Sequence, residues 1–367
     1  MNVNHWKNKR VLLTGHTGFK GSWMSLWLSQ LGAEVHGVSL PPATQPNLYS
    51  IAKIHTLLAS DTTLDICNLA ELKKIVAKMQ PDIVFHLAAQ SLVHYSYDFP
   101  IETYAVNVMG TANILEAVRF CDSVRAAVIV TTDKCYENRE WIYPYREPDR
   151  LGGRDPYSNS KACAELVSNA YRASFFSADR NMHLATARAG NVIGGGDWAS
   201  DRLIPDCIRA LSSGDAVSLR KPQAVRPWQH VLESISGYLL LGEHLLGKNG
   251  SQFAEAWNFG PNIEDMKSVG DVAVAVCQLL NIPINVGTEV HPKHEASLLL
   301  LDSTKAKEYL KWTPRWQLQK AVTETVAWYR HWLDGDDMLS YSQAQIKRYQ
   351  TLATPVQTEN NKEAVNG

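Results

Sequence analysis

The sequence predicts an α/β protein: a doubly wound parallel sheet with a smaller α/β lobe that binds substrate. Three observations lead to this expectation. Short apolar runs alternate with helical patterns up to Arg188, which is the order that builds a parallel sheet with helices on both faces. A glycine-rich turn joins the first run to the first helix, and the pattern becomes irregular after Arg188. The 367 residues suffice for two domains at roughly 150 residues each.

The first half of the chain supplies the elements of the expected sheet. Helices are expected where apolar residues recur at helical spacing and stop signals such as Gly32 or Pro81 follow. The strands are predicted at residues 10–14, 34–39, 56–60, 82–87, 126–131 and 183–188. The helices between them are predicted at residues 22–30, 69–79, 101–120 and 157–176.

The second half is less regular and contains no internal repeat. A loop is expected at 191–197, a strand at 216–219, and helices at 202–211, 231–246, 266–280, 303–310 and 318–333. The 231–246 helix is predicted to return to the sheet domain. We therefore expect a dinucleotide-binding domain of residues 1–188 plus about 224–260, and a lobe of about 189–223 plus 261–345. Residues 346–367 are expected to form a polar C-terminal tail.

Composition excludes several classes of protein. Hydrophobic residues make up 45% and charged residues 20%, with a net charge of −1, so we expect a globular protein that does not bind nucleic acid. No apolar run reaches the ~18 residues of a membrane span, and the first residues lack a secretion signal, which predicts a cytoplasmic protein without a membrane partner. The six cysteines are scattered and are expected to be reduced thiols.

Gly15, Gly18 and Gly21 form a GxxGxxG turn between the first strand and its helix. Glycines permit close backbone approach to a pyrophosphate, and the helix N-terminus offers free N–H groups. This context predicts a Rossmann-like dinucleotide site, although a glycine turn without a ligand has the same pattern. The second strand ends in Ser39-Leu-Pro-Pro, with no acid for a ribose hydroxyl and no base for a 2′-phosphate, which favours NAD over NADP. Lys20 is either a phosphate contact or a solvated lysine.

Tyr157 and Lys161 stand at i and i+4 on the helix that follows the fifth strand, so they share a helix face. A phenol with a pKa of ~10 is a poor base, and a neighbouring ammonium together with a cationic nicotinamide is predicted to lower that pKa by stabilising the phenolate. The fifth strand ends in Thr131-Thr132, whose hydroxyls can bond a reacting oxygen. The set predicts removal of a proton from a sugar hydroxyl while a hydride leaves the carbon that carries it.

These residues resemble the extended short-chain dehydrogenase/reductase superfamily of nucleotide-sugar enzymes. His86-Leu-Ala-Ala-Gln90 and Asn107 match it further, and Thr132-Asp133-Lys134 is similar to the hexose-nucleotide 4,6-dehydratases, of which the CDP-glucose enzymes carry Asp-Lys. The resemblance covers about residues 6 to 345. Further matching segments are 15–23, 188–198, 226–231 and 257–261.

The resemblance implies a lyase that uses NAD to oxidise C4 of a nucleotide-diphosphate hexose, removes water across C5 and C6, and returns the hydride to C6. Such enzymes serve the biosynthesis of deoxysugars of the O-antigen type. Tyr157 would take the C4 hydroxyl proton, while Thr132 and Lys161 hold the oxygen and the phenolate. Asp133 would protonate the leaving C6 hydroxyl. Lys134 would remove the C5 proton, or only orient Asp133 while Glu137 or Tyr136 lies nearer to C5.

The resemblance also implies binding residues and a homodimer or homotetramer formed through helices 101–120 and 157–176. Each substrate-binding arginine could instead form a surface ion pair. The implied cofactor contacts are Gly15, Gly18, Phe19, Lys20, Gly21, Asp65, Ile66, Leu87, Ala88, Ala89, Asn107, Tyr157 and Lys161. The implied substrate contacts are Gln90, Thr132, Asn191, Arg202, Arg226, Asn258 and His294.

Departures from the family pattern leave alternatives open. Ser91 and His94 stand where Pro and Arg are usual, and Cys67-Asn68 replaces Arg-Asp. The segment 291–296 is one residue longer than the family pattern. Because the resemblance places this segment near the nucleotide, another nucleotide hexose is an alternative substrate. A 4-epimerase, a reductase or an NAD-sensing protein on the same fold are alternative functions. His291, His294 and Glu295 lack metal-site spacing, so no metal is expected.

Overall fold

A seven-stranded sheet forms the centre of the computed structural model, which describes residues 3–176, 181–219, 221–285 and 296–351. All its strand pairs are parallel and follow the order β11-β6-β5-β4-β1-β2-β3. The chain reverses its direction across the sheet between β1 and β4, where open α/β sheets bind ligands. The strands are β1 (Arg10–Thr14), β2 (Glu34–Ser39), β3 (Ser60–Thr63), β4 (Ile83–His86), β5 (Ala126–Val130), β6 (His183–Ala189) and β11 (Ala256–Phe259).

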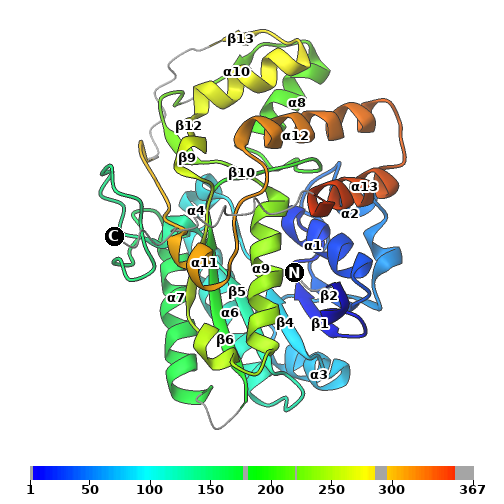
Figure 1. Cartoon of the computed structure of the whole chain (residues 1–367), viewed down its shortest axis with the longest axis vertical. Coiled ribbons are helices and arrows are strands. Elements are labelled where there is room, and N and C mark those ends of the chain that lie inside the picture. Colours follow the sequence, from blue (N-terminus) through cyan, green and yellow to red (C-terminus); the bar gives the residue numbers. More distant parts are fainter. Residues whose placement is uncertain (1–2, 177–180, 220, 286–295, 352–367) are drawn as a thin grey trace, which may run out of the picture.

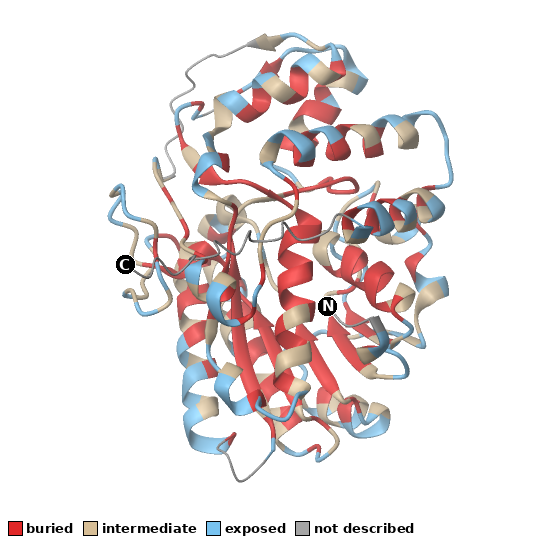
Figure 2. Ribbon diagram, in the orientation of Figure 1, coloured by how far each residue is buried: buried red, intermediate tan, exposed pale blue. Residues whose placement is uncertain are grey.

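Helices cover both faces of the sheet, as the sequence predicted. Because alternate side chains of a strand point to opposite faces, Val11 and Leu13 join one apolar core while Leu12 joins the other. Figure 2 shows these strands and α9 almost wholly buried. One face packs against α1 (Phe19–Gln30) and α9 (Val231–Leu246), the other against α3 (Leu69–Met79), α6 (Gly110–Arg119) and α7 (Pro156–Phe175).

The lobe lies beyond the carboxyl ends of the strands, at the top of Figure 1. Three two-stranded sheets and three helices form it, and β9 connects it back to the sheet domain. The sheets pair β7 (Val192–Ile193) with β10 (Gln229–His230), β9 (Val225–Pro227) with β12 (Met266–Ser268), and β8 (Val217–Ser218) with β13 (Ile284–Asn285). The helices are α8 (Leu203–Ser213), α10 (Val269–Leu280) and α12 (Leu318–Leu333).

Short elements complete the described part of the chain, and none of its helices is both long and apolar enough to cross a bilayer. The remaining α-helices are α2 (Leu48–Ile51), α4 (Val93–Asp98), α5 (Pro100–Tyr104), α11 (Thr304–Tyr309) and α13 (Met338–Thr351). The 3₁₀ turns are η1 (Val3–His5), η2 (Ile54–Leu57), η4 (Asp133–Cys135), η6 (Gly250–Phe253) and η7 (Ile263–Asp265), and η3 (Ala105–Met109) is a π-helical turn.

The structure corrects several predicted elements. The third strand is Ser60–Thr63, and a 3₁₀ turn that ends at Leu57 occupies the start of the predicted 56–60 run. This strand lies at the sheet edge, so its polar sequence needs no apolar face. The helix predicted at 101–120 is interrupted by the π turn, and β11 was not predicted. Helix α13 also extends beyond residue 346, where the tail was expected to begin, because Ile346 and Tyr349 are buried.

Candidate active site

A single large cavity of about 930 Å³ lies between the carboxyl ends of the strands and the lobe. It is the place where the β1–β4 switch point predicts a ligand. Of the predicted site residues, the following line it: Gly15, Gly18, Phe19, Lys20, Asp65, Ile66, Leu87, Ala88, Ala89, Thr132, Asp133, Lys134, Tyr157, Lys161, Asn191, Arg202 and Arg226.

The glycine turn forms one wall of the cavity, and its backbone packs too closely against its neighbours to admit side chains. Gly15 has φ of +78°, and a Cβ there would lie 2.6 Å from the Ala88 nitrogen. A Cβ on Gly21 would lie 2.1 Å from the Gly15 carbonyl oxygen, so Gly21 is required for packing and does not line the cavity. Gly18 begins α1 without a side-chain cap. The uncapped first turn fits the pyrophosphate of a dinucleotide.

The far end of this wall carries small polar groups. The Thr17 and Ser39 hydroxyls are 2.8 Å apart, and Thr17 also donates to the Leu40 carbonyl. The Asp65 carboxylate accepts from the Cys67 N–H at 2.8 Å. The cavity residues that follow β2, from Ser39 to Leu48, include no lysine or arginine that could pair with a 2′-phosphate.

Tyr157 and Lys161 lie buried on the first turns of α7. The helix starts where Asp155 accepts from the Ser158 N–H and Pro156 takes the first position. The Lys161 ammonium donates to the Val130 carbonyl at 3.3 Å. Burial lowers the pKa of Lys161 to about 8, although the Glu165 charge opposes this change.

The protein chain alone does not lower the pKa of Tyr157, and the predicted lowering also relied on the charge of a nicotinamide. Burial raises the pKa of the phenol to about 12, although a hydrogen bond with Thr132 and the charge of Arg202 favour the phenolate. Lys161 is not among the groups that shift the Tyr157 pKa, and its ammonium is bonded to the backbone of β5. Activation of this phenol therefore requires additional positive charge in the cavity.

Asp133 and Lys134 lie on the 3₁₀ turn that follows β5. The Thr132 hydroxyl donates to Asp133 Oδ1 at 3.0 Å and accepts from the Lys134 N–H at 3.4 Å. Asp133 is buried, and its Oδ2 has no hydrogen-bond partner among the described residues. Gly190 packs close to that oxygen, since a Cβ there would lie 3.0 Å from it and 2.4 Å from Pro227 Cγ. A buried carboxyl group with one free oxygen can deliver a proton into the cavity.

Cations converge on the other side of the cavity. Arg202 pairs with Asp197 at 2.8 Å, which raises the pKa of the guanidinium, and donates to the Ser91 hydroxyl at 3.2 Å. Lys20 points toward Tyr238, with 3.4 Å between Nζ and the phenol oxygen, and burial lowers its pKa to about 7. Arg226 donates to the carbonyl groups of Val225 and Ala296. These groups suit the charge of a diphosphate.

The structure does not bring Gln90, Asn107 or Asn258 to the cavity. Asn107 bonds the Gln90 backbone in both directions and donates to Ser160. The Gln90 side chain donates to Thr103 and accepts from the Leu92 N–H. These hydrogen bonds fix the loop after β4. They use the amide groups with which Asn107 was predicted to contact the cofactor and Gln90 the substrate.

Asn258 is fully buried in the sheet, and its amide is used by structural partners. It accepts from the Tyr136 hydroxyl and donates to the carbonyls of Tyr145 and Asp302. A substrate contact would require breaking these bonds, so the prediction for Asn258 is corrected to a structural role. His294, with the residues around it, lies outside the described residues.

Sequence reasoning missed several groups at or behind the cavity. His94 and Asp201 line it and lie 3.5 Å apart across its opening. Glu165 and Arg188 form a buried ion pair behind it, at 2.8 Å. The spacing of Glu165, four residues beyond Lys161, was the available signal, because it places both side chains on one helix face.

Comparisons with known proteins agree with this geometry. Residues 12–325 match the family model described as GDP-mannose 4,6 dehydratase. The chain is 48% identical to the CDP-glucose 4,6-dehydratase of Salmonella typhimurium, over 96% of this chain and 99% of that protein. A UDP-glucose 4-epimerase from Thermotoga maritima, solved with UDP-glucose, has a similar structure with a TM-score of 0.77, 22% identity and coverage of 88% and 99%. For a dTDP-glucose 4,6-dehydratase from Bacillus anthracis in complex with NAD, the TM-score is 0.73, the identity 23% and the coverage 90% and 99%.

Proposed function

The chain belongs to the GDP-mannose 4,6-dehydratase family, and on this premise we propose that it converts CDP-D-glucose to CDP-4-keto-6-deoxy-D-glucose with NAD as cofactor. The observation that carries the proposal is the placement of the Asp133 carboxyl beside Thr132 and Tyr157 in one cavity. Oxidation alone needs the phenol and the ammonium, whereas loss of water also needs an acid. The 48% identity to a CDP-glucose 4,6-dehydratase supports the choice of nucleotide.

Different residues of the chain carry out different steps of the proposed reaction. When bound, NAD accepts a hydride from C4 and returns it to C6. Tyr157 takes the proton of the C4 hydroxyl, and the Thr132 hydroxyl holds the oxygen. The resulting ketone acidifies the proton on C5, which Lys134 removes; the protonated Lys134 returns a proton to C5 when hydride is added to C6. Asp133 protonates the departing C6 hydroxyl, so that it leaves as water.

NAD fits the cavity through three features of this chain. The uncapped α1 turn would hold the pyrophosphate, the hydroxyls of Thr17 and Ser39 would contact the adenosine end, and Lys161 and Tyr157 would contact the nicotinamide end. A positively charged nicotinamide supplies the additional charge that the raised Tyr157 pKa requires. Arg202 and Arg226 are proposed to bind the diphosphate of the sugar nucleotide.

We also propose that the enzyme is a homodimer that uses the outer face of α5, α6 and α7. Large apolar side chains are exposed there, in a number typical of interfaces. They are Ile101, Met109, Phe120, Leu166 and Phe175. The six free cysteines fit a reducing compartment such as the cytoplasm.

The test is incubation of the purified protein and NAD with the CDP, dTDP and UDP derivatives of glucose and with GDP-mannose, followed by mass spectrometry and by proton NMR of the sugar. We expect CDP-glucose to lose one water and the others to react more slowly. Loss of water from another sugar nucleotide alone would change the substrate and keep the reaction. A 4-epimer of unchanged mass would replace the dehydratase with an epimerase, the function of the Thermotoga maritima structural relative.

A further inference from the structure

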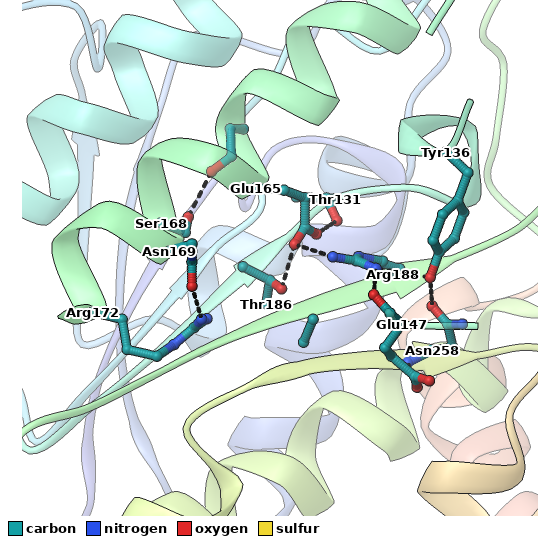
Figure 3. A network of polar contacts seen from close by, with 12 residues as sticks. Thr131, Tyr136, Glu147, Glu165, Ser168, Asn169, Arg172, Thr186, Arg188 and Asn258 are labelled. Carbon is teal, nitrogen blue, oxygen red and sulfur yellow. Dashed lines mark hydrogen bonds and ion pairs between the residues drawn. The ribbon is translucent and has the colours of Figure 1, made fainter. Parts of the chain in front are cut away.

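A buried ion pair behind the cavity holds both ends of the segment that carries Asp133 and Lys134. Glu165 and Arg188 are 3% exposed, and their side chains face each other between α7 and the sheet (Figure 3). Such a pair is costly to bury, and its net contribution to stability is often small. The residues that contact the ion pair therefore indicate what structural role it has besides stability.

At one end of the segment, the partner is Thr131. Its hydroxyl donates to Glu165 Oε1, while Glu165 Oε2 accepts from Thr186 at 2.7 Å and from Arg188 at 2.8 Å. These three donors satisfy the carboxylate, and with the Arg188 charge they lower its pKa despite burial. Thr131 directly precedes Thr132 and Asp133, so Glu165 fixes where the segment leaves β5.

At the other end, the partner is Tyr136. Arg188 Nη1 donates to the Tyr136 hydroxyl at 2.8 Å, and the guanidinium lies 5.0 Å from the centre of that ring. The Tyr136 hydroxyl in turn donates to Asn258 on β11 at 2.8 Å. Residues 132–135 thus lie between two anchors, which Figure 3 shows converging on the same ion pair.

We propose that Glu165 and Arg188 form a clamp that positions the Asp133-Lys134 turn for elimination, with Tyr136 and Thr131 as its two contacts. The inference rests on the proposed function, since it assigns elimination to this turn. A 3₁₀ turn of three residues has little stability of its own, so tertiary contacts must set its position. The same carboxylate lies one helical turn beyond Lys161, and the clamp therefore joins the two halves of the site.

The experiment compares Tyr136→Phe with the matched control Tyr145→Phe. The two rings are stacked 5.2 Å apart, and both hydroxyls are buried. Among the described residues, the Tyr145 hydroxyl bonds residues 138 and 139 and makes no hydrogen bond to Glu165 or Arg188. Both variants are studied as the NAD-loaded protein with CDP-glucose in a single turnover, in which NADH absorbance reports oxidation at C4 and product mass reports loss of water.

In Tyr136→Phe we expect elimination to slow at least tenfold, because a displacement near 1 Å can cost ~10²-fold. Oxidation should change less than threefold, so NADH accumulates, whereas Tyr145→Phe should behave as wild type. The clamp would be overturned if the two variants had the same elimination rate. It would also be overturned if oxidation and elimination slowed equally in Tyr136→Phe. Failure of the wild-type protein to remove water would instead overturn the proposed function.

Thr131→Val and Thr186→Val give a second comparison if Tyr136→Phe does not fold. Each removes one hydroxyl donor from the same Glu165 carboxylate, so their losses of thermal stability should be similar. Thr186 lies on β6 and does not line the cavity. NADH accumulation in Thr131→Val alone supports the clamp, and the same result in both or in neither contradicts it.

Discussion

The two halves of the site differ in what holds them. Tyr157 and Lys161 lie on a 20-residue helix, whose backbone fixes their separation. Asp133 and Lys134 lie on a single 3₁₀ turn, anchored by residues from α7, β6 and β11. Local geometry thus positions the oxidation half, and contacts between distant segments position the elimination half. Variants in the two halves should therefore fail at different steps.

The largest effect is expected for Tyr157→Phe. The substitution removes only the hydroxyl that accepts the C4 proton, so it should lower turnover by on the order of 10⁴, near the upper limit for an acid–base group. Folding, by circular dichroism, and NAD affinity, by calorimetry, should be close to wild type. No NADH should form in a single turnover. Near-normal turnover would remove Tyr157 from the mechanism.

Asp133→Asn should block the elimination of water and leave oxidation at C4 intact. The amide has nearly the shape of the carboxyl but donates no acidic proton, so elimination should slow by ~10²–10³. Bound NADH should then accumulate, unlike in Tyr157→Phe. In wild type, deuterium placed at C4 should appear at C6 of the product. Normal water loss by the Asn variant, or loss of deuterium to solvent, would contradict this division.

Lys134→Gln tests whether the turn supplies a base as well as an acid. Lys134 lines the cavity and is partly exposed. If it removes the C5 proton, the variant should accumulate NADH and lose ~10–10² in elimination rate. Exchange of the C5 proton with solvent, followed by NMR, should slow in parallel. An unchanged exchange rate would assign the base to another group.

The smallest effect is a titration of Lys161 in the protein chain without cofactor. Its pKa is about 8, below the ordinary 10.5, because burial disfavours the ammonium. The unfolded chain therefore binds more protons between about pH 8 and 10.5, and this group's contribution to stability increases as pH rises through that window. Carbon-13 NMR of labelled lysines should show the transition, and Lys161→Met should lack it. A midpoint near 10.5 would contradict the inferred burial.

The sequence pattern by itself determined the fold class and the types of residue at the site. The glycine spacing at 15, 18 and 21, the Tyr157–Lys161 interval and the Thr132-Asp133-Lys134 sequence are local features. Their geometry follows from a turn or a helix alone. These groups meet in one cavity because parallel strands present their carboxyl ends at the same edge.

Only the tertiary structure decided which polar groups face that cavity and how burial alters them. Asn258 and Gln90 have the chemistry of substrate ligands, but neighbours from distant segments use their amides. Burial raises the pKa of Tyr157, an effect that its sequence neighbours do not reveal. The Glu165–Arg188 pair joins residues 23 positions apart. Desolvation and such bonds depend on packing between segments, which no local pattern of residues specifies.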